Sequence, residues 1–511
     1  MDKKVENDIK LAKKNAFVNY LHYTINILLS FFMSPLILEY LGSVNFGVFK
    51  TVQKYLGFAT VADGRATQSL KWVIANNEGN DDYSKKRQAV GSAFLVWKYF
   101  SPILLLILAG LVYYIPYSVN ELDPIMFYQV RVLCILLGAN LFIVSIIGIP
   151  DSVLVGVNQG YRSMSVRILY LVLYNFAMIY VLFLGYDLIG IGIITLFFSI
   201  ITGIHIFVLA KKKIVWFGIE KPNKKDFLTF FKFSGWTLSW TFVSKFLLSS
   251  EVLLISFLIG GDSVSIFVFS SYIIQIGVTI PSLLTSSFIP SIGKFYGNSE
   301  FEHAKRTITN LRNLVFAWAI FIAGMTLFAN KIFVEYWVGK EYFIGDISNF
   351  LIVLLAIQLI IIRNEGFIIN VSLNLKKKVQ IGFITVIISL LLGYVFSINN
   401  DKPINGILLG LLLGRLYMFF IFPTMVSKLF NIEKKSFLKI LTNILKVVIL
   451  ILFSYVLGQF IPNVSLLLLA LLLISFTLFY GMLVFKVVLL KNVQTLILEN
   501  VIKNFRKLHK I

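Results

Sequence analysis

Long apolar blocks recur along this chain, and short segments rich in glycine, proline and charged residues separate them. Residues 188–210 and 464–485, for example, contain no charged side chain. A helix needs about 20 consecutive apolar residues to cross a hydrocarbon core about 30 Å thick. Because the backbone polar groups of a span in lipid must be satisfied inside the helix itself, the pattern predicts an all-α polytopic membrane protein.

About fourteen spans fit this pattern. They cover residues 16–41, 44–69, 90–116, 125–150, 163–185, 187–210, 228–259, 264–290, 309–337, 346–373, 376–398, 404–427, 440–461 and 464–488. Two pairs of similar segments indicate an internal repeat. YLGSVNFGVF (40–49) resembles FLIGGDSVSIFVF (257–269), and LIGIGIITLFF (188–198) resembles INGILLGLLLG (404–414). Parallel repeats of this kind are typical of transporters that bind substrate between their two halves.

The repeat predicts two pseudo-symmetric six-helix lobes followed by two extra C-terminal helices. The N-lobe is expected over residues 1–213, the C-lobe over 226–430, and the two extra spans within 438–490. Residues 491–511 place apolar side chains at helical spacing opposite basic ones, which predicts a cytoplasmic amphipathic tail lying on the membrane surface.

Lysine and arginine concentrate in alternate connecting segments. Examples are Lys13, Lys14, Lys85, Lys86, Arg87, Lys211, Lys212, Lys213, Lys305, Arg306, Lys376, Lys377, Lys378, Lys434 and Lys435. The opposite loops are short and carry mainly acidic residues such as Glu121, Asp123, Asp262 and Asp401. Since cytoplasmic loops are enriched in lysine and arginine, we expect a multi-pass plasma-membrane protein with both termini in the cytoplasm.

Composition narrows the functional classes. The 511 residues are 58% hydrophobic and 14% charged, with a formal net charge of +22. That charge follows the loops rather than a separate basic domain, so nucleic-acid binding is not expected. The sequence has no P-loop, zinc-ligand spacing or nucleophile elbow, and the outer loops are too short for a catalytic domain. We therefore expect a protein that is not an enzyme and that holds no metal or organic cofactor.

Several cations lie inside predicted spans, where they are costly. Lys54 lies about 15 Å below the outer end of its span by helical rise, and Lys245 and Arg415 are similarly central. A lysine or arginine at this depth costs roughly 2.5 to 3.5 kcal/mol on insertion scales. Lys50 and Arg65 fall on the same helical face as Lys54, one turn before it and three turns after it.

These cations outnumber the carboxylates within the spans and predict a wet cavity for an anionic substrate. The candidate substrate-binding residues are Lys50, Lys54, Arg65, Lys245, Arg363 and Arg415. The candidates for coupling to Na⁺ or H⁺ are Asp63, Glu251 and Glu365. The alternative is that each cation is paired with a carboxylate and serves helix packing. Gly406, Gly410 and Gly414, directly before Arg415, predict a close-packing stripe.

Four segments resemble a known family. LSFFMSPLILEYLGSVNFGVFK (29–50) and VADGRATQSLKWVIAN (61–76) are similar to the first two spans of the Wzx-type polysaccharide transport, or O-antigen flippase, family of the multidrug/oligosaccharidyl-lipid/polysaccharide (MOP) exporter superfamily. Residues 232–260 and 281–297 resemble its seventh and eighth spans. The matching positions are Pro35, Leu41, Gly42, Phe46, Gly47, Asp63 and Gly64.

The resemblance implies a MATE-like or MurJ-like fold and a flippase for an undecaprenyl-diphosphate-linked oligosaccharide in a bacterial plasma membrane. Polysaccharide polymerase and glycosyltransferases are the partners it suggests. Related lipid II flippases carry arginines in their first span, whereas residues 16–41 contain none. A MATE-like drug antiporter and a membrane glycosyltransferase or polymerase are the alternatives. The pattern does not identify the glycan or the coupling ion.

Overall fold

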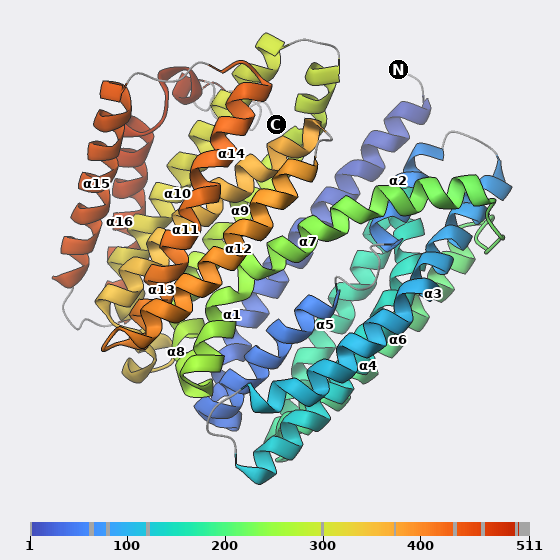
Figure 1. The fold of residues 1–511 in the computed structure, drawn as a ribbon, viewed down its shortest axis with the longest axis horizontal. Coiled ribbons are helices and arrows are strands. Elements are labelled where there is room, and N and C mark those ends of the chain that lie inside the picture. The colour runs from blue at the N-terminus through green and yellow to red at the C-terminus, as the bar shows by residue number, and fades with distance from the viewer. Residues whose placement is uncertain are drawn as a thin grey trace. The chain divides into compact units, whose positions relative to one another are not determined.

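The computed structural model describes residues 3–60, 66–77, 82–118, 123–297, 301–372, 375–432, 437–460, 466–495 and 499. Within these ranges the secondary-structure elements are helices joined by turns, so the all-α prediction is confirmed (Figure 1). The α-helices are α1 (Lys3–Ala59), α2 (Ala66–Asn77), α3 (Tyr83–Tyr114), α4 (Pro124–Gly156), α5 (Gly160–Phe183), α6 (Asp187–Lys213), α7 (Lys224–Leu258), α8 (Gly261–Ser270), α9 (Tyr272–Gly297), α10 (Phe301–Trp337), α11 (Asp346–Ile369), α12 (Leu375–Ile398), α13 (Pro403–Gly414), α14 (Leu416–Leu429), α15 (Phe437–Gln459) and α16 (Leu466–Val487).

Ten helices in the described part of the chain are long and apolar enough to cross a membrane, and the number is eleven if α8 and the first part of α9, which meet at a bend of 59°, count as one span. The chain is therefore a multi-pass membrane protein. This number is lower than fourteen partly because α1 contains both of the first two predicted spans up to Ala59. α15 and α16 contribute shorter apolar helices over Leu445–Gln459 and Leu471–Val487.

Gly42 bends α1 at the predicted turn between the first two spans. Its φ of 74° and ψ of 166° lie outside the helical region, in backbone space that residues with a Cβ rarely occupy. α1 ends at Ala59 and α2 begins at Ala66, and residues 61–65 of the second predicted span lie outside the described residues.

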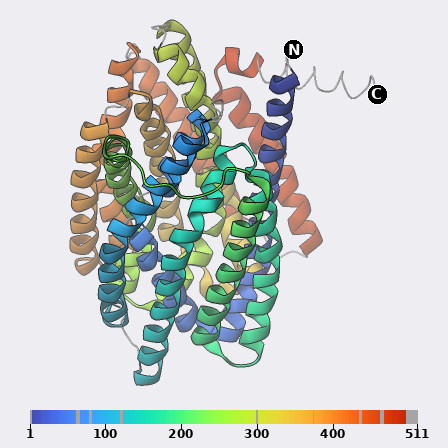
Figure 2. The ribbon, with the colours of Figure 1, turned by 90° about the vertical axis from the view of Figure 1, so that its right-hand side faces the viewer.

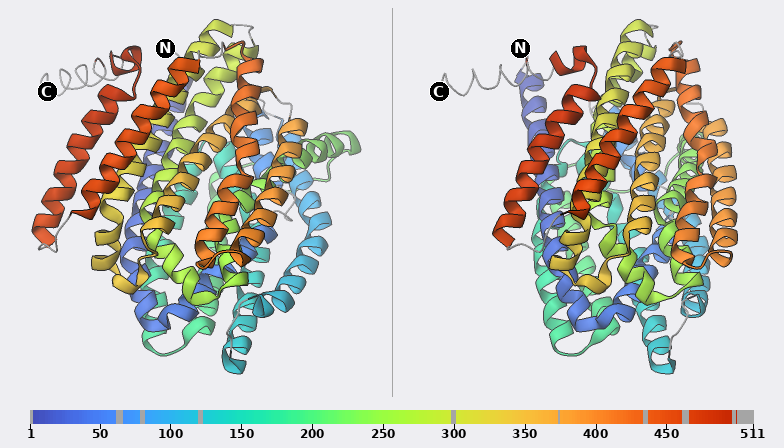
Figure 3. Two further views of the ribbon diagram at one scale, coloured as in Figure 1. Left: turned by 60° about the vertical axis from the view of Figure 1, so that its left-hand side comes forward. Right: turned by 90° about the vertical axis from the view of Figure 1, so that its left-hand side faces the viewer.

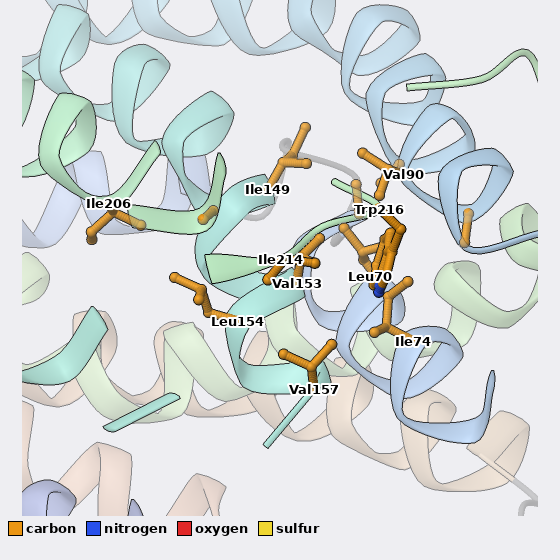
Figure 4. Close-up of a cluster of buried hydrophobic side chains, with 14 of the residues drawn as sticks. Leu70, Ile74, Val90, Ile149, Val153, Leu154, Val157, Ile206, Ile214 and Trp216 are labelled. Carbon is orange, nitrogen blue, oxygen red and sulfur yellow. The ribbon is translucent and has the colours of Figure 1, made fainter. Parts of the chain in front are cut away.

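Contacts divide the chain into two compact units, unit 1 (Met1–Ser265) and unit 2 (Ile266–Ile511). α7 packs with the N-terminal helices, so unit 1 extends beyond the predicted N-lobe. In unit 1, α4, α5 and α6 lie side by side, as Figure 2 also shows. The core at one end of this unit gathers Leu70, Val90, Val153, Ile206 and Trp216 from α2, α3, α4, α6 and the segment after α6 (Figure 4).

Glycines bring α12 and α13 together in unit 2, which confirms the predicted packing stripe. A Cβ on Gly406 would lie 2.2 Å from the carbonyl oxygen of Phe396, and one on Gly414 would lie 2.3 Å from the Cα of Ser389. α15 and α16 pack against α10 in the same unit (Figure 3). There Phe328 of α10 stacks on Phe476 of α16, with ring centroids 3.6 Å apart. The predicted tail over 491–511 lies outside the described residues beyond Thr495, except for Glu499.

Candidate functional site

Two of the predicted cations share one face in the second half of α1. Lys50 and Lys54 are one helical turn apart and both are half-buried. The ammonium of Lys50 lies over two aromatic rings, 5.1 Å from the centroid of Phe46 and 5.5 Å from that of Phe49. The rings attract the cation while the helix holds two like charges next to each other.

α7 brings a third cation and a carboxylate to this face. The Nζ atom of Lys245 lies 4.0 Å from the position that a Cβ on Gly57 would take, one turn beyond Lys54. Glu251, six residues further along α7, acts electrostatically on Lys54. We call Lys50, Lys54, Lys245 and Glu251 the lysine cluster. Glu251 can neutralise one of its three lysines.

Aromatic side chains line the contact between α1 and α7 next to the lysine cluster. Phe58 of α1 lies 4.4 Å from Phe246 and 6.5 Å from Phe242, measured between ring centroids. Tyr55 lies 6.0 Å from Tyr114 of α3 in an edge-on arrangement. A cation cluster bordered by aromatic rings offers both charge for an anionic group and flat apolar surface for sugar rings.

A close glycine contact holds the segment of α1 just before Lys50 against α8. A Cβ on Gly47 would lie 1.7 Å from the carbonyl oxygen of Gly261, and the hydroxyl of Ser265 donates a hydrogen bond of 2.5 Å to the carbonyl of Ser43. These residues belong to the two segments whose sequences resemble each other. The similarity therefore coincides with a close backbone contact that only glycine permits.

Unit 2 contains a buried ion pair between α10 and α11. Nε of Arg312 donates a hydrogen bond of 2.8 Å to Oε1 of Glu365, and Nη2 donates to Oε2. The carboxylate side chain is 3% exposed and that of Arg312 is 22% exposed. Asn364 donates to the same carboxylate at 3.1 Å, and Arg312 also donates to the carbonyl of Pro423 on α14 at 3.2 Å. Glu365, a candidate for ion coupling, is thus held by an arginine.

Three further cations of unit 2 lie on α11, α12 and the junction of α13 and α14. Arg363 is half-buried on α11. Arg415 is fully buried at the junction where α13 ends and α14 begins. Lys378 is also fully buried, within α12, and donates hydrogen bonds of 2.8 Å to the carbonyl of Gly366 and 2.7 Å to Oδ1 of Asn370. Lys378 therefore packs inside unit 2, whereas Lys376 and Lys377 of the same basic run are exposed.

The structure thus places three of the six predicted substrate-binding cations, Lys50, Lys54 and Lys245, on the contacting helices α1 and α7, with Glu251 within electrostatic range of Lys54. Arg363 and Arg415 belong to unit 2. Asp63 and Arg65 lie outside the described residues. Among the residues that the structure does describe, no group of three or more histidine, cysteine, aspartate or glutamate side chains could hold a metal ion.

A small polar cavity in unit 1 was not predicted. Its volume is about 200 Å³, and Lys71, Ser145, Asp151, Ser152 and Arg167 are among its lining residues. Arg167 of α5 pairs with Asp151 of α4 at 3.0 Å. Asp151 lies just beyond the end of the predicted span 125–150, and Arg167 lies just inside the predicted span 163–185. Charged side chains at such positions commonly reach the membrane–water interface. Only the packing of α4 against α5 shows that they meet.

Solved structures with a similar fold belong to membrane transporters. The inward closed conformation of the lipid II flippase MurJ matches 92% of this chain and 98% of its own, with a TM-score of 0.66 and 15% identity. An inward-facing MATE family transporter of the MOP superfamily matches 81% of this chain and 96% of its own, with a TM-score of 0.56 and 16% identity.

A MOP superfamily transporter from Pyrococcus furiosus, whose binding pocket is described as having reversed polarity, gives a TM-score of 0.58 at 15% identity over 84% of this chain and 97% of its own. No family model and no curated protein sequence matches the chain. At these identities the comparisons establish a MurJ-like and MATE-like fold, which confirms the predicted fold class.

Proposed function

We propose that this protein is a Wzx-type flippase that moves an undecaprenyl-diphosphate-linked oligosaccharide across a bacterial plasma membrane. The lysine cluster is the observation that carries this proposal. Three lysines beside one glutamate leave positive charge on α1 and α7, and a diphosphate supplies the matching negative charge. The similarity to the fold of a lipid II flippase supports the same class of substrate.

Each lysine attracts the diphosphate strongly because the cluster is half-buried. Two opposite unit charges 4 Å apart attract each other by about 4 kcal/mol at an effective dielectric constant of 20, against about 1 kcal/mol in water. The rings of Phe58, Phe242 and Phe246 give the first sugars an apolar surface. Alternating access then exposes the loaded cluster first to the inner and then to the outer leaflet, while the prenyl chain stays in lipid.

Coupling to Na⁺ or H⁺ forms part of the proposal, with Glu251 and Asp63 as its first candidates. Glu251 lies among the lysines, so its charge changes how strongly they hold a diphosphate. Glu365 would have to leave Arg312 in order to bind an ion, which makes it the less accessible candidate. The transported oligosaccharide would serve O-antigen, capsule or exopolysaccharide synthesis. A polysaccharide polymerase and glycosyltransferases are therefore the proposed partners of the flippase. Both termini face the cytoplasm in this scheme.

Export in cells tests the proposal. In the native host, deletion of the gene should abolish the surface polysaccharide, and the wild-type protein should restore it. A Lys54→Gln, Lys245→Gln double variant should be present in the membrane and fail to restore export. Lys377→Gln, which changes an exposed lysine of α12, serves as the control. Normal polysaccharide in cells that carry the double variant would contradict the proposal.

A MATE-like antiporter for small molecules is the second candidate, because MATE transporters are also among the similar folds. Such a protein would exchange a cation for Na⁺ or H⁺ through a carboxylate within the membrane. Glu251 is the carboxylate positioned for it. Efflux of cationic dyes that depends on Glu251 and is insensitive to Lys54→Gln would favour this function over lipid transport.

A further inference from the structure

A long apolar groove lies on unit 1, away from the lysine cluster. Its volume is about 820 Å³. Side chains of α3, α4 and α6 line it, including Phe94, Ile143, Ile147, Ile204 and Phe207. Of the lining residues that the structure describes, Lys211 alone carries a charge, and it marks one end of the groove.

The groove has the length of one membrane leaflet. Ile200 and Lys211 are its first and last lining residues on α6, and eleven residues of helix rise about 16 Å. This is about half of a hydrocarbon core of 30 Å. Ile204 and Phe207, between these ends, are 59% and 50% exposed, so a bound chain would cover apolar surface. The dimensions match an acyl chain that lies along α6 within a single leaflet.

The end of the groove at Lys211 is strongly basic. Lys211, Lys212 and Lys213 form the last turn of α6, and all three are exposed. Among the residues that the structure describes, none of these three lysines takes part in an ion pair. They therefore present positive charge at the level where a chain in the groove would carry its headgroup.

A strap formed by residues 214–222 holds this end in place. The carbonyl of Trp216 accepts a hydrogen bond of 2.9 Å from Nε of Arg87, and the amide of Glu220 donates to the carbonyl of Arg87 at 3.2 Å. The side chains of Arg87 and Glu220 pair at 3.3 Å. Trp216 is buried in the core of unit 1 (Figure 4). Phe217, Gly218 and Ile219 of the strap line the groove, so its wall is already formed.

We propose that this groove is a binding site for an anionic glycerophospholipid, with one acyl chain along α6, the phosphate at Lys211, and the charges of Lys212 and Lys213 adding to the local positive potential. Basic groups at the ends of membrane helices attract anionic headgroups, and the apolar wall supplies the remaining contact. A zwitterionic lipid with the same chains fills the groove equally well but gains less from the three lysines. The site is independent of the transported substrate.

Lipid retention by the purified full-length protein tests the proposal. The probes are palmitoyl-oleoyl phosphatidylglycerol and phosphatidylcholine, which have identical chains, and native mass spectrometry counts the lipids that remain bound in detergent. The wild-type protein should retain phosphatidylglycerol preferentially. Substitution of all three lysines by glutamine should reduce that preference about tenfold or more. A Lys376→Gln, Lys377→Gln variant, which changes exposed lysines of α12, should keep it.

A second variant fills the groove without changing charge. The atoms nearest to a Cβ on Gly218 belong to Arg87 and lie 3.5 Å or more away, so Gly218→Phe can place a ring in the groove. It should reduce retention of both lipids. Gly110→Phe is its control, because nothing lies within 4 Å of a Cβ there. Thermal unfolding of each variant reports whether it is folded.

Three results would overturn the proposal. The first is equal retention of the two lipids by the wild-type protein. The second is an undiminished preference for phosphatidylglycerol in the triple glutamine variant. The third is displacement of phosphatidylglycerol by an equal concentration of a long-chain polyprenyl phosphate, since the groove would then bind a polyprenyl lipid instead.

Discussion

Replacement of Glu365 by glutamine tests what the buried ion pair contributes. The substitution keeps the shape of the side chain but removes its charge, and it places an amide group beside the donors of Arg312. Arg312 is only 22% exposed, so its charge would remain in a poorly solvated site with one of its two carboxylate hydrogen bonds lost. Removing one partner of a buried pair costs about 3 to 5 kcal/mol. We expect Glu365→Gln to destabilise the protein by about 3 kcal/mol.

A double-mutant cycle separates structural from functional roles of this pair. Arg312→Gln together with Glu365→Gln removes both charges, and we expect it to recover most of the lost stability, with a coupling energy of about 2 kcal/mol. Unfolding of the purified variants in mixed micelles with increasing fractions of SDS measures these differences. Asp401→Asn, which changes an exposed carboxylate in unit 2, is the control. A cost for Glu365→Gln below about 0.5 kcal/mol, typical of surface positions, would refute the reasoning.

The same double variant bears on ion coupling. If Glu365 only neutralises Arg312, the double variant should transport as the wild type does once its stability has recovered. Restored stability with lost transport would instead assign Glu365 a direct part in coupling.

Three further predictions concern packing and pH. Gly47→Ala should lower the thermal midpoint, because its Cβ would lie 1.7 Å from the carbonyl oxygen of Gly261, whereas Gly110→Ala should not; equal midpoints would contradict the contact. Gly410→Ala should cost about 1 to 3 kcal/mol by overpacking α12 against α13, measured by SDS unfolding, and no cost would argue against the stripe. The hydrogen bond from Ser84, and then the hydrogen bond and charge of Arg87, lower the pKa of Glu220 below its ordinary value of 4.5. The ionised Glu220 therefore stabilises the strap fully above pH 4.5, and this stabilisation is lost as the pH falls through the lowered pKa. The difference in stability between the wild-type protein and Glu220→Gln should shrink only in that acidic range. A difference that already shrinks between pH 7 and 5 would contradict this assignment.

Hydropathy was sufficient to predict most of the apolar helices, because apolar length and helical hydrogen bonding are local properties of the sequence, but not the division of residues 264–290 between α8 and α9. The bend at Gly42 and the stripe of Gly406, Gly410 and Gly414 were also predictable, since glycine permits backbone conformations and close contacts that other residues do not. The end of α1 at Ala59 was not predicted, although Asp63, Gly64 and Arg65 interrupt the apolar pattern shortly after it.

The candidate site was predictable only in part. One helical face carries Lys50 and Lys54, so their proximity followed from spacing alone. Their meeting with Lys245 and Glu251 depends on how α7 packs against α1, which no local pattern encodes. The pair of Arg312 and Glu365 joins residues 53 positions apart for the same reason. Lys376, Lys377 and Lys378 form one basic run in the sequence, but only Lys376 and Lys377 are exposed, whereas the position of Lys378 on α12 turns it inward.

Transbilayer movement of a fluorescent undecaprenyl-diphosphate sugar in proteoliposomes tests the central claim most directly. The purified wild-type protein should accelerate the loss of fluorescence when an impermeant quencher is added. Lys54→Gln and Lys245→Gln should each slow this movement by about tenfold or more, because each removes one attractive charge at the diphosphate. Lys377→Gln should leave it unchanged. Movement at the wild-type rate in a variant with both Lys54 and Lys245 replaced would contradict the account.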